Sequence, residues 1–375
     1  MARPGTLDPD TRHGDAQRVH LSSPPVEVAR VERFMVKRVT SPATGLKATM
    51  ADVAAATGLS WVTVARAMSA PHLVALKSRE RIQAAIVELG YSPNLSARSL
   101  VSRATKIVGV IVPTIQNSLY ADTMEGLTDV LLPAGYQLLL GHSAFDDDRE
   151  DAVIQSILGR RPDAIVLTQG CRRPELRERL LQASIHVMEV WGLSPQPIDM
   201  AVGYDEAQAA RLLADYLLDR GYDHFAYVTR PLQRFGFAQE RWDGFQSAIR
   251  QRSSRSKVLL LEYEGDPARG CDAVNLVRSQ HPDVQVLFCA SSLFAVGALL
   301  ECARRSIEVP RELAVVGIGD VQLAALTHPR LTVVSNRARD IGRRAGELIV
   351  ARLQGGASVP QVVDLGVELI ERESA

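Results

Sequence analysis

Residues 49–68 read TMADVAAATGLSWVTVARAM, a stretch that contains two helix starts separated by one tight turn. Thr49, followed three residues later by Asp52, is a variant of the capping box that begins a helix. Gly58 stands where the chain must reverse, and Ser60 can cap a second helix. Two short helices joined in this way are typical of a helix-turn-helix, whose second helix enters the major groove of DNA.

The two predicted helices divide into an inner and an outer face. The apolar residues recur at spacings that place them inside, and they are Val53, Ala54, Leu59, Val64 and Met68. The outer side then carries the expected DNA contacts: Trp61, Val62 and Arg66 in the major groove, Ser60 and Thr63 on phosphates, and Thr49 at the first helix start. Short capped helices with a glycine turn also occur in enzymes, so the pattern by itself is compatible with a DNA-binding protein and with an enzyme.

A third helix is expected over residues 77–89, because its apolar residues share one face and Gly90 is a typical C-cap residue. Pro93 stops any continuation, and residues 95–101 can form only one or two turns of helix, which are marginal alone. We expect this short helix to order on DNA, with Leu100 wedged into the minor groove. The candidate contacts of this segment are Asn94, Ala97 and Leu100.

The series of motifs resembles one family of regulators. It consists of ADVA at 51–54, GLS at 58–60, TVAR at 63–66, GYSPN at 90–94, Ala97 and Leu100. In this order it resembles the DNA-binding headpiece and hinge of lactose-repressor (LacI-type) transcription regulators, and the resemblance extends over residues 46–373. It implies a homodimer on pseudo-palindromic operator DNA and a small-molecule effector bound in the cleft of a core domain. The absence of leucine heptads near the C-terminus argues against a tetramer.

Composition agrees with a globular protein. The 375 residues are 46% hydrophobic and 23% charged, and no apolar run is long enough to cross a membrane. We expect a cytoplasmic location, because charges and prolines occupy the N-terminus where a secretory signal would be apolar. The four cysteines lack the close spacing of metal sites and are expected to be reduced thiols without cofactor or metal: Cys171, Cys271, Cys289 and Cys302.

The formal charge of zero conceals a basic segment. Eight basic and three acidic residues lie between Lys47 and Lys106, a net charge of +5. Basic side chains displace counterions from phosphates and give DNA affinity that falls steeply with salt. The local excess therefore favours nucleic acid as a partner.

The predicted domain organisation has four parts. Residues 1–45 contain scattered prolines and charges without an apolar period and are expected to be disordered, with Met35 as an alternative translation start or the segment as a flexible arm. Residues 46–93 form the helix-turn-helix domain, residues 94–105 the hinge, and residues 106–375 the effector-binding and dimerisation core.

The core pattern alternates short apolar runs with amphipathic stretches. Strands are expected at 107–112, 137–140, 164–167, 186–190, 224–228, 258–261, 284–288, 313–317 and 331–334, and helices at 121–132, 149–158, 206–219, 241–250 and 338–353. This βαβ pattern predicts an α/β core of two doubly wound parallel sheets, similar to periplasmic binding proteins, with a crossover near residue 330. Ligands in such folds bind outside the carboxyl ends of the strands, and closure of the cleft would give a two-state element.

Within this family the core is most similar to the gluconate-utilisation repressor branch. The residues that carry this resemblance are Pro113, Thr114, Asn117, Tyr120, Ala121, Gly135, Tyr136, AVGYD at 201–205, Glu301, Cys302 and DLG at 364–366. The resemblance implies a repressor of sugar or sugar-acid metabolism genes.

Candidate effector contacts follow the predicted strand ends. They are Asn117, Tyr120, Glu189, Trp191, Arg230, Arg241 and Ser292, with Arg234 in the loop after Arg230. Arg241 precedes Trp242-Asp243-Gly244, where the family places a ligand-binding arginine. A guanidinium fork suits a carboxylate or phosphate, so an anionic effector is expected. Ser292 stands where family members carry an aspartate that grips sugar hydroxyls. The loss of this carboxylate supports an anion over a neutral sugar, and it equally leaves open an altered or weakened ligand site.

The sequence does not indicate an enzyme. It lacks a phosphate-binding glycine loop with a following lysine, a third glycine after Gly317 and Gly319, and a Gly-x-Ser-x-Gly elbow. The acidic run at 146–148 suits the start of a helix better than a metal site, because the helix dipole favours negative charge there. A ligand-responsive DNA-binding regulator is the predicted function. The alternative is a small-molecule binding protein whose headpiece is vestigial.

Overall fold

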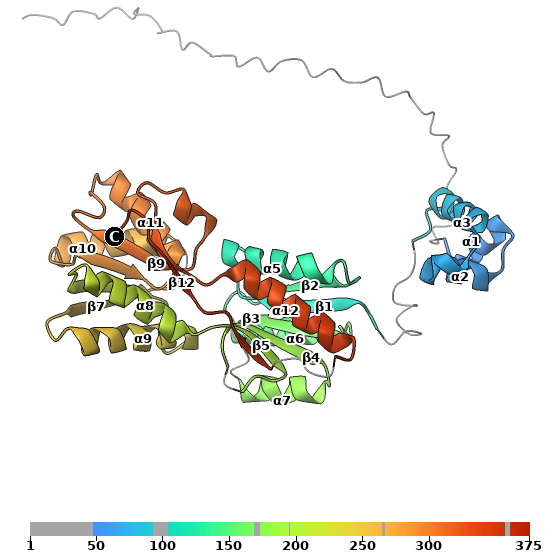
Figure 1. The fold of residues 1–375 in the computed structure, drawn as a ribbon, viewed down its shortest axis with the longest axis horizontal. Helices are drawn as coiled ribbons and strands as arrows, with labels where there is room; N and C mark the ends of the chain where they lie inside the picture. The colour runs from blue at the N-terminus through green and yellow to red at the C-terminus, as the bar shows by residue number, and fades with distance from the viewer. Residues whose placement is uncertain (1–47, 93–103, 169–172, 195, 265–266, 357–360) are drawn as a thin grey trace, which may run out of the picture. The chain divides into compact units, whose positions relative to one another are not determined.

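The computed structural model describes residues 48–92, 104–168, 173–194, 196–264, 267–356 and 361–375 (Figure 1). The chain divides into two compact units, Met1–Pro93 and Asn94–Ala375. The predicted N-terminal extension and the hinge contacts Asn94, Ala97 and Leu100 lie outside the described residues.

The first unit is a small helical domain built from local signals. It contains α1 (Met50–Thr57), α2 (Trp61–Ser69), a 3-10 turn (Pro71–Leu73) and α3 (Leu76–Leu89). Thr49 and Asp52 form the predicted capping box of α1, and Ser60 Oγ accepts a hydrogen bond from the backbone N of Thr63 at 3.2 Å. Gly58 ends α1 with φ of 58°, a left-handed conformation that suits glycine.

The three helices of this unit bury a small core. Its buried members are Val53, Val64, Ile82, Ala85 and Tyr91, with Ala54, Leu59 and Met68 partly buried against them. The opposite side of α2 stays open, since the side chains of Trp61 and Val62 are 58% and 55% exposed. The predicted split into an inner apolar face and an outer face therefore holds.

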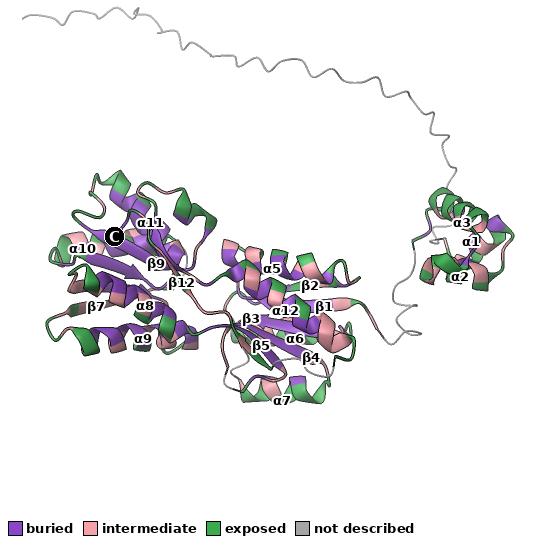
Figure 2. Cartoon of the chain, viewed as in Figure 1, coloured by how far each residue is buried: buried purple, intermediate pink, exposed green. Residues whose placement is uncertain are grey.

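The second unit contains two six-stranded sheets. The order of the first is β11-β5-β4-β3-β1-β2, and that of the second is β12-β10-β9-β8-β6-β7. All described strand pairs are parallel except β10 with β12. The inner strands of both sheets are buried, whereas the edge strands β2, β7, β11 and β12 are partly exposed (Figure 2). This architecture confirms the expected fold class.

The first sheet is formed by β1 (Ile107–Val112), β2 (Gln137–His142), β3 (Ala164–Thr168), β4 (His186–Gly192), β5 (Met200–Tyr204) and β11 (Val362–Asp364). The second is formed by β6 (His224–Thr229), β7 (Lys257–Glu262), β8 (Val286–Cys289), β9 (Ala314–Ile318), β10 (Thr332–Ser335) and β12 (Glu368–Ile370).

The helices of this unit are α5 (Ser118–Leu131), α6 (Asp147–Leu158), α7 (Pro174–Gln182), α8 (Glu206–Asp219), α9 (Gly236–Arg252), α10 (Ala268–Gln280), α11 (Ser292–Arg304) and α12 (Ala338–Leu353), with a 3-10 turn at Gln322–Ala325. Among the described residues no helix has the length and apolar character needed to cross a membrane.

Several elements were missed or misplaced in the sequence analysis. Strands β5, β11 and β12 and helices α7, α10 and α11 were not predicted, and α9 begins at Gly236, five residues before the predicted start. The short edge strands β11 and β12 have three residues each, too few for a recognisable alternation. Because α9 starts earlier, Arg241 lies inside the helix and not at its first residue.

The chain passes between the two halves of the core three times. It leaves the first sheet after β5, returns through α12 after β10, and leaves again between β11 and β12. Helix α12 packs on α5 of the first half (Figure 1). The return to the first half follows Ser335, where β10 ends.

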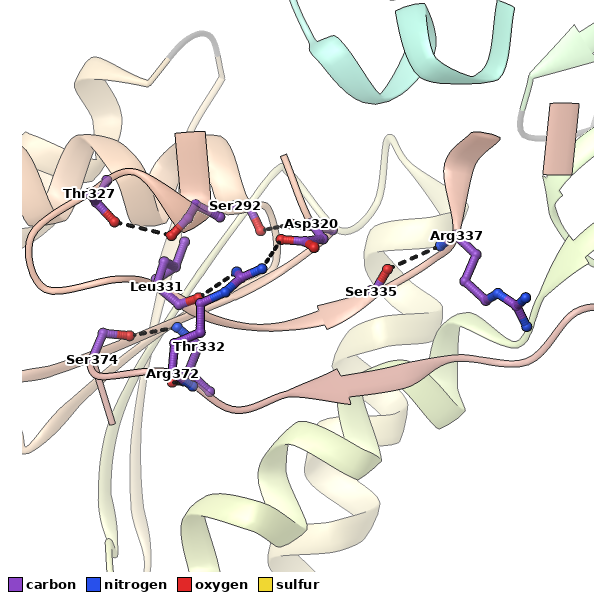
Figure 3. Close-up of polar contacts among 11 residues, drawn as sticks. Ser292, Asp320, Thr327, Leu331, Thr332, Ser335, Arg337, Arg372 and Ser374 are labelled. Atoms are coloured by element: carbon purple, nitrogen blue, oxygen red, sulfur yellow. Dashed lines mark hydrogen bonds and ion pairs between the residues drawn. The ribbon is translucent and has the colours of Figure 1, made fainter. Parts of the chain in front are cut away.

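The segment after β12 is fastened to the second half by polar contacts (Figure 3). Arg372 Nη1 donates to the carbonyl oxygen of Leu331 and Nη2 to Asp320 Oδ1, both at 2.8 Å. Ser374 Oγ accepts from the backbone N of Thr332 at 2.9 Å. These contacts hold the C-terminal segment against the turns that precede the cleft strand β10.

Candidate functional site

The outer face of α2 is the candidate DNA-reading surface of the first unit. Trp61, Val62 and Arg66 are all exposed along this helix. Ser60 and Thr63 lie at its N-terminus, with their hydroxyl oxygens 2.8 Å apart. Large apolar side chains left open on so small a domain mark a surface for a partner.

Most of the net positive charge predicted for residues 47–106 lies outside the three-helix domain. The described residues 48–92 contain the four basic residues Arg66, Lys77, Arg79 and Arg81 against three acidic ones, a net charge of +1. The rest of the predicted excess comes from Lys47, Arg98, Arg103 and Lys106 at the flanks. Basic residues near the hinge segment therefore carry most of the net charge available for phosphates.

Thr49, the remaining DNA-contact candidate of this unit, takes part in the cap of α1. Its hydroxyl and its backbone N both donate to Asp52 Oδ2 at 2.7 Å. These hydrogen bonds hold the pKa of Asp52 below its ordinary value. Thr49 therefore orients the start of α1, and its exposed hydroxyl stays available at the surface.

The second unit contains a cavity between its two halves. The second half forms the floor from residues at the carboxyl ends of β6, β8, β9 and β10, which are Thr229, Ala290, Ile318 and Asn336. The first half contributes Thr114, Asn117, Leu119, Tyr120, Phe145 and Trp191. Ligands of parallel α/β sheets bind at such strand ends, so this cavity is the candidate effector site.

Two aromatic residues form one wall of the cavity. Tyr120 and Trp191 stack with ring centroids 4.5 Å apart, and Trp191 Nε1 donates to Thr123 Oγ1 at 3.2 Å. Trp191 has φ of 88°, and a Cβ on Gly203 of the neighbouring strand would lie 1.9 Å from its carbonyl oxygen. Gly203 thus permits the backbone shape that turns this indole into the cavity wall. Asn117 caps α5 by accepting from the backbone N of Leu119 at 3.1 Å.

Arg241 is held by three acceptors of the protein. Its Nε donates to Glu206 Oε2 at 2.6 Å, Nη1 to the carbonyl oxygen of Ala290 at 2.5 Å and Nη2 to the hydroxyl of Tyr204 at 2.8 Å. The side chains of Arg241 and Glu206 are 8% and 0% exposed. Burial lowers the pKa of Arg241, but Glu206, Tyr204 and Tyr227 together outweigh burial and raise it, so the arginine stays charged. Arg241 and Glu206 form a neutral buried pair.

Two oxygen atoms of the cavity lining are left without a protein partner. Thr229 Oγ1 and Asn336 Oδ1 are buried, and neither makes a hydrogen bond to any residue that the structure describes. Buried polar atoms are nearly always hydrogen-bonded in folded proteins. Both atoms are therefore candidates to bind polar groups of a ligand.

Phe145 closes the cavity from the first half. The guanidinium of Arg230 lies 4.1 Å from the centroid of its ring, and Phe235 packs edge-on against it at 5.6 Å. Arg234 Nη2 donates to its carbonyl oxygen at 2.9 Å. Phe145 also lines a second, outer cavity together with Arg234, so it forms part of the partition between the two.

The structure brings most of the predicted effector residues together and leaves two aside. Asn117, Tyr120, Trp191, Arg230 and Arg241 line the inner cavity. Glu189 is buried within β4, where its Oε1 accepts from the backbone N of Ile198 at 3.0 Å. Ser292 is also buried, and its hydroxyl donates to the carbonyl oxygen of Gly319.

The positions of Glu189 and Ser292 outside the cavity lining each have a local physical cause. Side chains alternate between the two faces of a strand, and Glu189 lies on the face of β4 where Val187 packs near Ile198. Trp191, whose φ of 88° departs from the extended strand, packs with Tyr120 on the opposite face. Ser292 turns toward the loop after β9, and its neighbours Ser291 and Leu293 line the cavity instead.

Three polar residues of the cavity lining were not predicted as effector contacts, although they share a feature that the sequence shows. Thr114, Thr229 and Asn336 each lie at or just after the end of a predicted strand. Listing polar residues at every strand end would have found all three. No group of His, Cys, Asp and Glu able to hold a metal ion occurs in the described ranges, and Asp146 caps α6 by accepting from the backbone N of Arg149 at 2.7 Å.

Comparisons with known proteins agree for both units. Residues 49–94 match the model of "Bacterial regulatory proteins, lacI family", and residues 214–375 match that of a "Periplasmic binding protein-like domain". The chain is 31% identical over 329 residues to the HTH-type transcriptional regulator GntR of Pseudomonas aeruginosa, covering 87% of this chain and 95% of the relative. The GntR regulator of Escherichia coli K12 is 28% identical, with coverage of 85% and 96%.

Solved structures show the same architecture. A LacI family regulator from Silicibacter pomeroyi has a TM-score of 0.78 at 25% identity, covering 87% of this chain and 99% of the other. The transcription regulator GntR from Chromobacterium violaceum has a TM-score of 0.66 at 28% identity, covering 72% and 98%. The lac repressor dimer bound to operator and an anti-inducer is 19% identical with a TM-score of 0.75 and a coverage of 88% and 99%, a likeness in fold.

Proposed function

Because the chain belongs to the LacI family of DNA-binding transcription regulators, we propose that it represses genes of sugar-acid uptake or catabolism and that a gluconate-like acid controls it. The headpiece reads the operator, and the effector binds the inner cavity of the core. The proposed domain limits are 46–93 for the headpiece, 94–105 for the hinge and 106–375 for the core. A homodimer on a pseudo-palindromic operator follows from the symmetry that such half-site readers use.

The cavity chemistry carries the choice of an acid. The only charged residues among the described residues of the cavity lining are two arginines, Arg230 and Arg241, and the second of them is paired with Glu206 behind the lining. Guanidinium groups suit carboxylate and phosphate oxygens. The position where the family places a sugar-gripping aspartate is occupied by Ser292, which removes one source of repulsion toward an anion. Similarity to regulators named GntR supports the same effector class.

Calorimetry tests this proposal directly. D-Gluconate or 6-phosphogluconate is expected to bind the purified protein and to weaken operator binding by about 5- to 150-fold, the usual range of allosteric coupling. D-Glucose and other neutral sugars serve as controls and are expected to bind more weakly. Binding of the neutral sugars without binding of the acids would refute the effector class. Failure to bind the DNA upstream of its own gene in a gel-shift would instead favour a binding protein with a vestigial headpiece.

Substitution of Arg66 tests the DNA-reading surface. Arg66→Ala is expected to cost about 1–3 kcal/mol at one operator position, because an arginine in the major groove makes a bidentate contact to a guanine edge. Fluorescence anisotropy with the operator, single-base variants and random DNA measures the effect. The loss is expected to disappear when the contacted base pair is changed. An equal loss on operator and random DNA would show that Arg66 contacts only the phosphate backbone.

A further inference from the structure

The floor of the inner cavity is an elongated trough. Its residues follow the order of neighbouring strands, with Asn336 after β10, Ile318 at the end of β9, Ala290 after β8 and Thr229 at the end of β6. Adjacent strands lie about 4.8 Å apart, so the two ends of the trough are separated by roughly 14 Å. A ligand that contacts both ends must therefore lie across the strands.

The middle of the trough is electrically neutral. Arg241 reaches the carbonyl oxygen of Ala290, next to the central strand β8, while its charge is opposed by the buried Glu206 at 2.6 Å. Its three nitrogen atoms already donate to acceptors of the protein. This residue shapes the floor but offers an acid group little net attraction.

The two ends of the trough differ in hydrogen-bonding character. At the β10 end, Asn336 Oδ1 is an acceptor and seeks a donor such as a ligand hydroxyl. At the β6 end, Thr229 Oγ1 can donate, and the next residue, Arg230, adds a cation. Phe145 supports this guanidinium through its flat face, and a guanidinium stacked in this way keeps its N–H groups in the plane for an acceptor.

We infer that the effector lies along this trough with its acid group at Thr229 and Arg230 and a hydroxyl group at Asn336, and that Arg241 positions the floor. This inference rests on the proposed function and adds an orientation to it. Burial lowers the pKa of Arg230 more than the nearby Tyr120 and Glu264 raise it, so this cation has lost part of its hydration and gains from a ligand anion in the cavity.

Calorimetry with two probes of equal length tests the acid end. D-Sorbitol differs from D-gluconate in having a hydroxymethyl group in place of the carboxylate. The wild-type protein is expected to prefer D-gluconate, and Arg230→Gln to reduce that preference by about 10- to 150-fold, the value of a hydrogen bond to a charged group. The matched control is Arg250→Gln, at an exposed arginine of helix α9 outside the cavity lining, and it is expected to keep the preference. The double variant Arg241→Gln with Glu206→Gln, which replaces the neutral ion pair by a neutral amide pair, tests the alternative position of the acid group.

The hydroxyl end has its own test. Asn336→Ala is expected to weaken the binding of D-gluconate and of D-sorbitol by the same factor. The binding of D-glycerate is expected to be unaffected, because this three-carbon acid is too short to reach from Arg230 to Asn336. Equal weakening of D-glycerate would overturn the orientation.

The outcomes separate this inference from the proposed function. A wild-type protein without preference for D-gluconate over D-sorbitol would refute the acid effector and the orientation together. A wild-type preference that survives Arg230→Gln but is lost in the double variant would leave the acid effector standing and place the acid group on Arg241 instead. Loss of the preference in Arg230→Gln alone supports the inference.

Discussion

Arg241→Leu is expected to destabilise the core by about 3–5 kcal/mol, because it leaves a buried carboxylate without its counter-charge. Glu206 is 0% exposed and Arg241 Nε is the donor to its Oε2, while Oε1 has no partner among the residues described. Urea denaturation followed by circular dichroism measures the loss. An effect no larger than that of an exposed arginine, such as Arg250→Leu, would contradict the prediction.

The double variant Arg241→Met with Glu206→Leu is the matched control. Replacing both members of a buried ion pair by apolar residues of similar size is often neutral in stability, so most of the loss is expected to be restored. If the double variant is as unstable as the single one, the loss comes from packing and not from the orphaned charge.

The stability of the single variant Arg241→Leu is also expected to depend on pH. Burial raises the pKa of Glu206 and Arg241 opposes this effect, so without the arginine the folded-state pKa rises further. A raised folded-state pKa gives stability that is fully present below the ordinary pKa of the carboxyl and is lost as the pH rises through the raised value. Arg241→Leu is therefore expected to be more stable at pH 5 than at pH 8, and the double variant to lack this difference.

Gly126→Val is expected to cost about 3 kcal/mol, at the upper end of the range for overpacking. Helix α5 meets α12 so closely at this position that a Cβ would lie 2.1 Å from the carbonyl oxygen of Arg339 and 2.8 Å from the backbone N of Arg343. Both contacts are backbone atoms, so the helices would have to separate.

Gly192→Val is the control for this substitution. Gly192 also lies in the first half of the core, at the end of β4, and a Cβ there meets no atom within 4 Å. Thermal unfolding of the two variants is expected to show a clear loss for Gly126→Val and little change for Gly192→Val. Similar melting temperatures for both would show that the α5–α12 contact can relax.

Much of the fold could be predicted because its signals are local. The capping pair of Thr49 and Asp52, the left-handed turn at Gly58 and the cap at Ser60 each act within a few residues, and the structure contains all three. Apolar runs of four to six residues likewise predicted the inner strands of both sheets except β5, since these strands are buried on both faces. The three-residue strands β11 and β12 escaped because they are defined by their neighbours in the sheet.

The candidate effector site was also predictable only in part. Asn117, Tyr120, Trp191, Arg230 and Arg241 were named from the sequence because they follow or flank predicted elements near the cleft, and they do line one cavity. Their individual roles could not be named in this way. Whether an arginine is free to bind an acid depends on what stands beside it in space.

The sequence by itself therefore determined the helix-turn-helix, the two-sheet core, the family and the arginine-rich character of the cleft, because each is encoded by periodicity, capping or motif order. Only the tertiary structure decided that Arg241 is paired with Glu206, 35 positions away, and that Asn336 faces the same trough as Thr229. It also decided that Ser292 and Glu189 turn away from the cavity. The reason is that sheet order and the three chain crossings bring distant residues together, and no local pattern records which of them become neighbours.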